Sequence, residues 1–464
     1  MKIPNTSLFH FVLSILFGSL LFHLALAQAP NGQDPVQRTA KFNEYMDAAV
    51  RVNRFSGSVL VARDGKAIFS KGYGMANYEW DIPNTPQTAF RIGSITKQFT
   101  AAAIMILQER GKLNVNDSVC KYVTECPAAW EPITIRHVLT HTSGIPNYTS
   151  FPGWMEKKAV LPITPAELLA DYKNKPLDFA PGEKYSYSNS GYHLLGLIIE
   201  RGSGKSYSDF LAENIFAPLG LKQTGYDLSK NIIRHRASGY VRDGDGVLNA
   251  AYLDMLIPYA AGSLYSTTED LLRWEQALYT EKLLTRKSLD EMFTPFKGNY
   301  GYGWGVGKRQ ERAAMSHSGG IYGFSAYIVR YPDDKATVIV LTNVQGTASE
   351  RVADSLSSIL FGTKYELPKE RKAIALAPQV LEKYVGDYQL NPTTSLTVTL
   401  EDGKLMLNII NNPKMELFAE SETDFFVKTI DALVKFEKDE TGKVTLLRLI
   451  VGGRGAGMAA TKVK

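Results

Sequence analysis

Cysteine is scarce in this sequence: the 464 residues include only Cys120 and Cys126, together with seven histidines. Two isolated cysteines are too few for a structural zinc or iron–sulfur site, so we expect no metal and no other cofactor. In an oxidising compartment the two thiols could form a short local disulfide. The alternative is a pair of small apolar residues in a surface loop.

The sequence also lacks blocks of Lys or Arg, and its formal net charge of +5 is small for its length. A protein that binds nucleic acid or a strongly anionic membrane concentrates positive charge on one surface, so neither partner is expected. No G-x-S-x-G motif occurs, and strands do not alternate regularly with helices. These two absences exclude the α/β-hydrolases that use a Ser-His-Asp triad.

The N-terminus has the pattern of a secretory signal peptide. Lys2 precedes a mostly apolar stretch, residues 8–24, and Ala25-Leu26-Ala27 is a small-residue cleavage site. Cleavage would remove residues 1–27 and leave an exported protein, periplasmic or secreted. The alternative is an uncleaved membrane anchor, because the apolar stretch approaches the length that spans a bilayer.

The length of the chain exceeds what one hydrophobic core usually serves, so two domains are expected. In residues 28–362, strand patterns at 58–62 and 67–70 and again at 322–331 and 336–343 flank a helix-rich middle. That layout predicts an α+β domain, in which an antiparallel sheet flanked by helices lies beside an all-helical subdomain.

Local signals give finer expectations within this domain. Residues 28–38 are polar and contain proline, so a loose lead-in is expected before a helix over residues 43–52. Thr164-Pro165-Ala166-Glu167 and Ser266-Thr267-Thr268-Glu269 each match a capping box, so a helix is expected to begin at each.

The composition changes after a charged linker, residues 363–379. Residues 380–464 are short alternating segments with turn residues between them, and 396–400 and 405–409 form a hairpin around Asp402-Gly403. This pattern predicts an all-β barrel. The segment has no His and no Cys, so we assign it a structural or substrate-positioning role and no chemistry.

The candidate nucleophile is Ser94, three residues before Lys97 at the start of a long helical pattern. Residues three apart share a helix face, so the amine could take the serine proton. Free N–H groups at a helix N-terminus also suit a developing oxyanion. The spacing alone is weak, because Ser118 and Lys121 match it too, in a loop; we interpret that second match as chance. The alternative for Ser94 is a capping serine beside an exposed lysine.

Two further motifs carry suitable chemistry. Tyr187-Ser188-Asn189 supplies a phenol that can shuttle a proton and a carboxamide that can orient Lys97 and a substrate amide. His317-Ser318-Gly319-Gly320 lies at the start of the late strand pair, where a glycine-containing edge lets substrate approach the backbone and the Gly320 N–H could complete an oxyanion hole. The alternatives are a core aromatic for Tyr187 and a surface histidine at a turn for His317.

Taken in order, Ser-x-x-Lys, Tyr-x-Asn and [Lys/His]-x-Gly resemble the three motifs of serine β-lactamases and penicillin-binding proteins. The chain is most similar to the branch with class C β-lactamases, D,D-carboxypeptidases, D-aminopeptidases and related esterases. The similarity runs from Asn43 to Leu360, and the C-terminal segment looks like the lipocalin-like barrel often fused to such enzymes. Supporting stretches are residues 90–94, 139–144, 187–192 and 262–267.

The resemblance implies an acyl-enzyme on Ser94. It implies Lys97 and Tyr187 as the acid/base pair and Asn189 as the orienting residue. The N–H groups of Ser94 and Gly320 would form the oxyanion hole, and His317, Ser318 and Gly319 would line the substrate side. The expected substrate is a small molecule or peptide with an amide or ester bond, and a peptidoglycan-derived compound is one candidate. A penicillin-binding or sensor module that deacylates slowly is the alternative.

One residue departs from the family pattern. Most β-lactamases and penicillin-binding proteins have Lys in the third motif, where its charge holds the substrate carboxylate. Here the residue is His317, which is mostly neutral at pH 7. The change weakens the case for efficient penicillin hydrolysis and favours ester or D-amino-acid peptide substrates. His141, in the stretch His141-Thr142-Ser143-Gly144, looks structural in this family, so no role is assigned to it.

Overall fold

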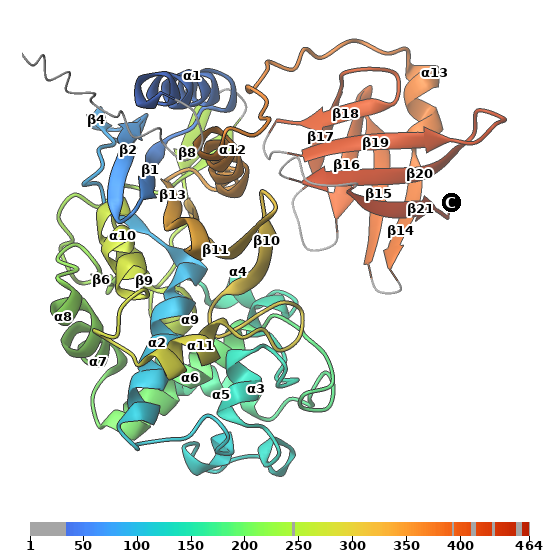
Figure 1. Ribbon diagram of the computed structural model, residues 1–464. Coiled ribbons are helices and arrows are strands. Elements are labelled where there is room, and N and C mark those ends of the chain that lie inside the picture. The colour runs from blue at the N-terminus through green and yellow to red at the C-terminus, as the bar shows by residue number, and fades with distance from the viewer. Residues whose placement is uncertain are drawn as a thin grey trace, which may run out of the picture.

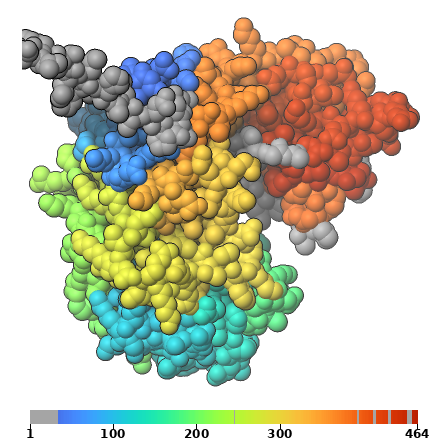
Figure 2. Space-filling model, viewed as in Figure 1, coloured from blue at the N-terminus to red at the C-terminus, as the bar shows by residue number. Residues whose placement is uncertain are grey.

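The computed structural model describes residues 34–243, 246–391, 394–409, 414–428, 432–451 and 457–463. The predicted signal peptide lies outside the described residues. Figure 1 shows a larger α+β region and a smaller β-barrel beside it, and the barrel forms a distinct lobe in the space-filling view (Figure 2). The predicted fold class is therefore confirmed.

The larger region is organised around an antiparallel sheet with the strand order β10-β11-β12-β13-β1-β2. β13 pairs with β1 along its whole length, so the late strand pair completes a sheet that the early hairpin begins, as the sequence predicts. The strands span β1 Gly57–Arg63, β2 Lys66–Tyr73, β10 Gly305–Arg309, β11 Arg312–Ile321, β12 Phe324–Tyr331 and β13 Ala336–Thr342.

Helices cover both faces of this sheet because the alternate residues of its central strands are apolar on both sides. Val59 and Val61 of β1 pack under α1 (Pro35–Asn53) and α12 (Ser349–Phe361). Leu60 points the other way, into the core that contains α2 (Thr96–Glu109) and α10 (Thr268–Ala277).

The first helix begins earlier than the sequence analysis expects. Asp34 accepts a hydrogen bond from the Val36 N–H at 3.1 Å, and Pro35 occupies the first helical position. An N-cap acid followed by proline is a strong start signal. The expectation of a loose lead-in up to residue 38 is therefore wrong from Pro35 onward.

One of the two predicted capping boxes forms as expected. Thr164 and Glu167 exchange side-chain and backbone hydrogen bonds at the start of α5. The other is displaced by one residue: Thr267 caps α10 by accepting from the Asp270 N–H. Ser266 is instead the last residue of a short strand, and its hydroxyl bonds to Thr224.

The middle of the chain forms the helical subdomain around α2, whose first twelve residues are all buried. Three small sheets accompany it: β5-β9-β6, β3-β4 and β7-β8. The elements span β3 Met75–Asn77, β4 Ile82–Pro83, β5 Phe90–Arg91, α3 Ile135–Leu139, α4 Trp154–Lys158, α5 Pro165–Lys173, α6 Asn189–Ser203, α7 Tyr207–Leu211, α8 Ala217–Leu219, β6 Gly225–Tyr226, β7 Tyr240–Asp243, β8 Gly246–Asn249, α9 Tyr259–Gly262, β9 Leu264–Ser266 and α11 Arg286–Phe293.

Cys120 and Cys126 form a disulfide in a loop of this subdomain, which decides between the two alternatives left open by the sequence.

None of the helices within the described ranges is both long and apolar enough to cross a bilayer.

The C-terminal region is a closed barrel of eight consecutive antiparallel strands, β14 to β21. Its interior is apolar, with Tyr388, Leu407 and Phe425 fully buried, so the barrel is a packed core of its own. The elements span α13 Pro378–Leu381, β14 Gly386–Asn391, β15 Thr394–Glu401, β16 Lys404–Ile409, β17 Met415–Ala419, β18 Asp424–Val427, β19 Ala432–Lys438, β20 Val444–Val451 and β21 Met458–Lys462.

Candidate active site

Ser94 lies in a 3₁₀ turn, Gly93–Ile95, that leads directly into α2. Gly93 has a left-handed backbone with φ of +50°, and a Cβ there would stand 2.9 Å from the Gly320 nitrogen. Only glycine accommodates both conditions without strain. The turn therefore brings the serine against the edge of β11, which is the edge that the third motif provides.

Lys97 is buried on the first turn of α2, and three oxygen atoms surround its amine. Nζ lies 3.0 Å from Ser94 Oγ, 2.9 Å from Asn189 Oδ1 and 2.9 Å from the carbonyl oxygen of Ala261. None of the three carries a formal charge. Burial lowers the pKa of Lys97 well below its usual value, since no neighbouring anion compensates for the lost hydration.

The pattern of partners fits an uncharged amine. A neutral amine has two N–H donors and one lone pair. The Asn189 and Ala261 oxygens can only accept, so they take the two N–H groups, and the lone pair is left for the Ser94 hydroxyl proton. This is the arrangement that a general base for Ser94 requires.

Tyr187 lies beside the serine and the lysine. Burial raises the pKa of its phenol, and Ser94 acts on that pKa in the opposite direction. Lys97 Nζ lies 4.7 Å from the centre of its ring. The phenol thus stays protonated near neutral pH and is placed to pass a proton to or from the atoms around Ser94 Oγ.

Asn189 is the first residue of α6, and Ser188 caps that helix through the Gly191 N–H. Two residues that the sequence analysis did not single out hold the Asn189 amide. The backbone N–H of Asn189 donates to Asn147 Oδ1 at 3.0 Å, and its side-chain Nδ2 donates to Thr149 Oγ1 at 3.2 Å. Both lie in the loop after Gly144, where no local pattern indicates which side chains turn inward.

The third motif lies in the second half of β11 and ends one residue before Ile321, whereas the sequence analysis places it at the start of the strand pair. A Cβ at Gly319 would stand 2.0 Å from the Ile92 carbonyl oxygen, so β11 packs tightly against the chain just before Ser94. At Gly320 a Cβ would meet nothing within 4 Å. The Gly320 backbone therefore faces open space next to the Gly93–Ser94 turn, and Ser318 is exposed on the same strand.

His317 is buried and uncharged in this site. Its Nδ1 lies 2.6 Å from the Ser318 carbonyl oxygen and its Nε2 lies 2.7 Å from the Tyr300 hydroxyl. A carbonyl oxygen only accepts, so Nδ1 carries the proton and Tyr300 donates to Nε2. Burial, with a smaller effect of Lys97, lowers the pKa of His317 to about 4. Tyr300 is a third residue that sequence reasoning missed.

The second Ser-x-x-Lys match has none of these features. Ser118 Oγ accepts from the Cys120 N–H, and Lys121 forms an ion pair with Asp117 at 3.1 Å while its side chain is 63% exposed. Ser118 caps the short turn Val119–Lys121 on the surface of the protein.

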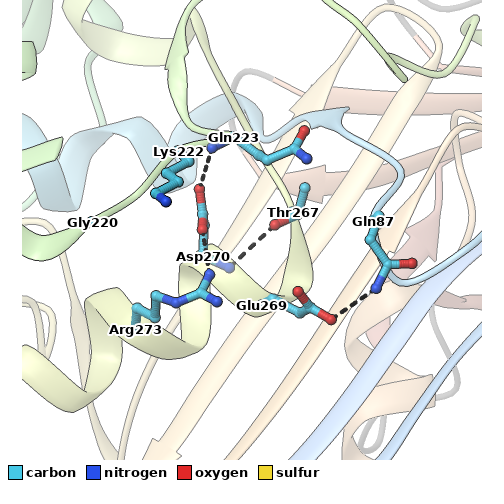
Figure 3. A pocket seen from close by; sticks show the side chains of 8 residues that line it. All are labelled: Gln87, Gly220, Lys222, Gln223, Thr267, Glu269, Asp270 and Arg273. Carbon is cyan, nitrogen blue, oxygen red and sulfur yellow. Dashed lines mark hydrogen bonds and ion pairs between the residues drawn. The ribbon is translucent and has the colours of Figure 1, made fainter. Parts of the chain in front are cut away.

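A separate hollow of about 350 Å³ lies at the start of α10 and contains none of the predicted site residues (Figure 3). Asp270 there accepts from the Gln223 N–H at 2.7 Å and pairs with Arg273, and Glu269 accepts from Gln87. The carboxylates of Asp270 and Glu269 therefore both have partners within the protein, so we assign them a structural role.

Comparison with known proteins identifies the family of this chain. A family profile described as Beta-lactamase matches residues 39–360. The chain belongs to the β-lactamase family of serine hydrolases. A second profile, described as a domain of unknown function, matches residues 370–452, and the closed barrel fits the predicted lipocalin-like domain.

Individual relatives extend over most of the chain. A penicillin-binding protein of Bacillus subtilis (strain 168) is 34% identical over 418 residues, which cover 84% of this chain and 91% of that protein. The octameric penicillin-binding protein homologue from Pyrococcus abyssi superimposes with a TM-score of 0.63 at 28% identity, covering 91% of this chain and 99% of the other. The D-amino acid amidase from Ochrobactrum anthropi gives a TM-score of 0.60 at 25% identity, with coverages of 71% and 97%.

Proposed function

We propose that this member of the β-lactamase family hydrolyses an amide or ester bond through an acyl-enzyme on Ser94. The observation that carries the proposal is the amine of Lys97, which is buried, bonded to two obligate acceptors and 3.0 Å from Ser94 Oγ. A serine hydroxyl becomes an effective nucleophile when such a base removes its proton.

The residues support a two-step reaction. Lys97 Nζ takes the proton of Ser94 as Oγ attacks the substrate carbonyl, and the N–H groups of Ser94 and Gly320 stabilise the oxyanion. Tyr187 then donates a proton to the leaving amine or alcohol. Lys97 passes its proton to Tyr187 and can then take a proton from a water molecule, which attacks the ester on Ser94. Lys97 gives that proton to Ser94 Oγ as the acid is released.

The third motif narrows the proposed substrate. An uncharged His317 offers no cation to a substrate carboxylate, so we propose small esters and D-amino-acid amides or peptides ahead of β-lactams. The relatives include a protein named as a D-amino acid amidase. A second candidate is a penicillin-binding module that acylates and then deacylates slowly, which is favoured by the relatives named as penicillin-binding proteins.

Intact-mass measurement and turnover together test the proposal. The wild type should hydrolyse a chromogenic acetyl ester steadily, and its mass should rise transiently by one acyl group with esters, D-alanyl peptides or β-lactams. Ser94→Ala should lose both properties, while Ser118→Ala should keep both. Full activity in Ser94→Ala would contradict the nucleophile. A stable adduct without turnover on every substrate would favour the binding module.

We also propose that the protein is exported, with a hydrolase domain over residues 28–362 and a barrel domain over residues 380–464 joined by the linker 363–379. The N-terminal pattern and the Cys120–Cys126 disulfide support export. N-terminal sequencing of protein recovered from the producing cells should begin at Gln28; a start at Met1 would favour the anchor.

A further inference from the structure

His141 makes two hydrogen bonds and a ring contact to the segment that carries Tyr187. It follows α3 and has a left-handed backbone with φ of +56°. Its carbonyl oxygen accepts from the Ser186 N–H at 2.9 Å, and its Nδ1 accepts from the Ser188 N–H at 3.1 Å. Its ring centre lies 4.3 Å from that of Tyr187. Thus one histidine contacts three consecutive residues, 186–188, and two of them belong to the second motif.

The histidine acts without a charge. Because Nδ1 accepts a hydrogen bond from the Ser188 N–H, the neutral ring carries its hydrogen on Nε2. Burial, followed by the effects of Lys97 and His317, lowers the pKa of His141 well below its usual value. Its Nε2 has no hydrogen-bond partner among the described residues, and the rings of Tyr192 and Tyr300 lie 5.0 and 4.8 Å away. Nothing in this surrounding calls for proton transfer by His141.

We propose that His141 is the positioning residue for Tyr187, fixing the phenol where it can protonate the leaving group of the substrate. The inference rests on the proposed function, since it assigns a partner to the proposed proton donor. The hydrogen bonds and the ring contact of His141 reach residues 186–188, so its effect passes through that backbone and through the Tyr187 ring.

The physical reason is the accuracy that proton transfer demands. A donor must stay within hydrogen-bond reach of the atom it protonates, and a displacement of about 1 Å can cost on the order of 100-fold in rate. The chain around Tyr187 is not in a regular element, because α6 begins only at Asn189. Its placement therefore depends on contacts such as those from His141.

Two substitutions by side chains of similar size separate the contribution of the hydrogen bond from that of the side-chain volume. His141→Asn places an oxygen where Nδ1 now accepts from Ser188, and asparagine tolerates the left-handed backbone. His141→Leu fills a similar space without an acceptor and leaves the buried Ser188 N–H unpaired. Circular dichroism and thermal unfolding establish that each full-length variant folds before kinetics are measured.

The decisive readout is the dependence on the leaving group. An amide needs a proton on its departing nitrogen, whereas a 4-nitrophenyl ester releases a stabilised anion and needs none. For His141→Leu we expect kcat on a D-amino-acid amide to fall by about 10- to 100-fold, the range for a proton donor displaced by up to about 1 Å. KM and the rate on the activated ester should change by less than about 3-fold, and His141→Asn should recover most of the amide rate.

The outcomes are distinct from those that test Ser94. Equal losses on the amide and the ester in a folded His141→Leu would contradict the positioning role and leave the nucleophile untouched. The same conclusion holds if His141→Asn is as slow on the amide as His141→Leu. Ser94→Ala measured in parallel should lose both substrates; if it does not, the proposed function itself fails.

Discussion

The chain contains Ser-x-x-Lys twice, and the two copies lie in opposite surroundings. Lys97 is wholly buried among uncharged oxygens, whereas Lys121 is 63% exposed and paired with Asp117. The Ser94 hydroxyl lies 3.0 Å from Lys97 Nζ, whereas the Ser118 hydroxyl caps a turn. The same spacing thus gives a candidate base–nucleophile pair in one place and a solvated ion pair in the other.

The difference comes from what distant segments bring to each copy. The acceptors around Lys97 come from α6 and α9, which lie 92 and 164 residues further along the chain. The side-chain contacts of Ser118 and Lys121 are local: Ser118 Oγ accepts from the Cys120 N–H, and Lys121 pairs with Asp117. Burial without a counter-charge is what moves the amine toward its neutral form, and a surface helix turn cannot supply it.

Removing each lysine should give the largest contrast. Lys97→Met keeps an unbranched side chain in the core but removes the proposed base, so kcat/KM on an acetyl ester should fall by about 10²- to 10⁴-fold. Lys121→Met should change it by less than about 2-fold. Steady-state kinetics on both purified variants provide the measurement. Comparable losses in the two variants would show that the two copies do not differ in function.

The same lysine provides a folding control. In the folded state the pKa of Lys97 lies well below its unfolded value, so near neutral pH the unfolded chain binds the extra proton. That difference makes stability rise with pH up to the unfolded pKa of about 10.4 and fall as pH decreases. Lys97→Met lacks this penalty and should melt no lower than the wild type at pH 6, which separates lost chemistry from lost folding.

A carboxylate beside Lys97 should make its surroundings resemble those of Lys121. Asn189→Asp places a negative charge about 2.9 Å from Nζ, which favours the ammonium form and raises the pKa of Lys97. Because the neutral amine is the proposed base, the acid limb of kcat/KM should move to higher pH and activity at pH 7 should fall. The measurement is a full pH–rate profile.

Asn147→Asp is the matched control for this change. Its carboxylate can still accept the Asn189 N–H, but it does not contact Lys97. Its acid limb should shift by less than that of Asn189→Asp. If Asn189→Asp lowers kcat/KM equally at all pH values, the charge of Lys97 does not govern the reaction.

The left-handed backbone at two glycines, Gly93 and Gly111, offers a smaller effect. Gly93→Ala would strain a left-handed residue and press a methyl group to 2.9 Å from the Gly320 nitrogen. Gly111→Ala would also strain a left-handed backbone, at φ of +67°, but its methyl group would meet no atom within 4 Å. We expect Gly111→Ala to lose about 1–2 kcal/mol of stability and Gly93→Ala to lose about 1–3 kcal/mol more, measured by urea unfolding. Only Gly93→Ala should slow turnover; equal stabilities would mean that the turn and β11 can separate without cost.

Much of the fold follows from local pattern. The hairpin around Asp64-Gly65, the late strand pair and the barrel hairpin around Asp402-Gly403 all form where alternation and turn residues predict them. The misplaced features are those with competing local signals. Ser266 and Thr267 could each cap α10, and the strand that claims Ser266 decides between them.

The candidate site was only partly visible in the sequence. Ser94, Lys97, Tyr187 and Asn189 stand out because the three motifs occur in a family order. Asn147, Thr149 and Tyr300 do not, because they lie in irregular segments and meet the site only through tertiary contacts. The carbonyl of Ala261 has no sequence signal at all, since every residue carries that group.

The smallest expected effect on activity concerns the disulfide next to Ser118. Cys120 belongs to the second Ser-x-x-Lys copy, and its bond to Cys126 closes a loop of few residues. Replacing both cysteines with serine should lower stability by about 2 kcal/mol, since a short loop gains less from closure than a long one. Because this segment shares no contact with Ser94 or Lys97, kcat/KM should stay within about 2-fold of the wild type. Urea unfolding with and without reductant, read beside ester turnover, measures both quantities. A large loss of turnover in the folded double variant would show that the second copy communicates with the first, and the contrast between them would then be one of degree.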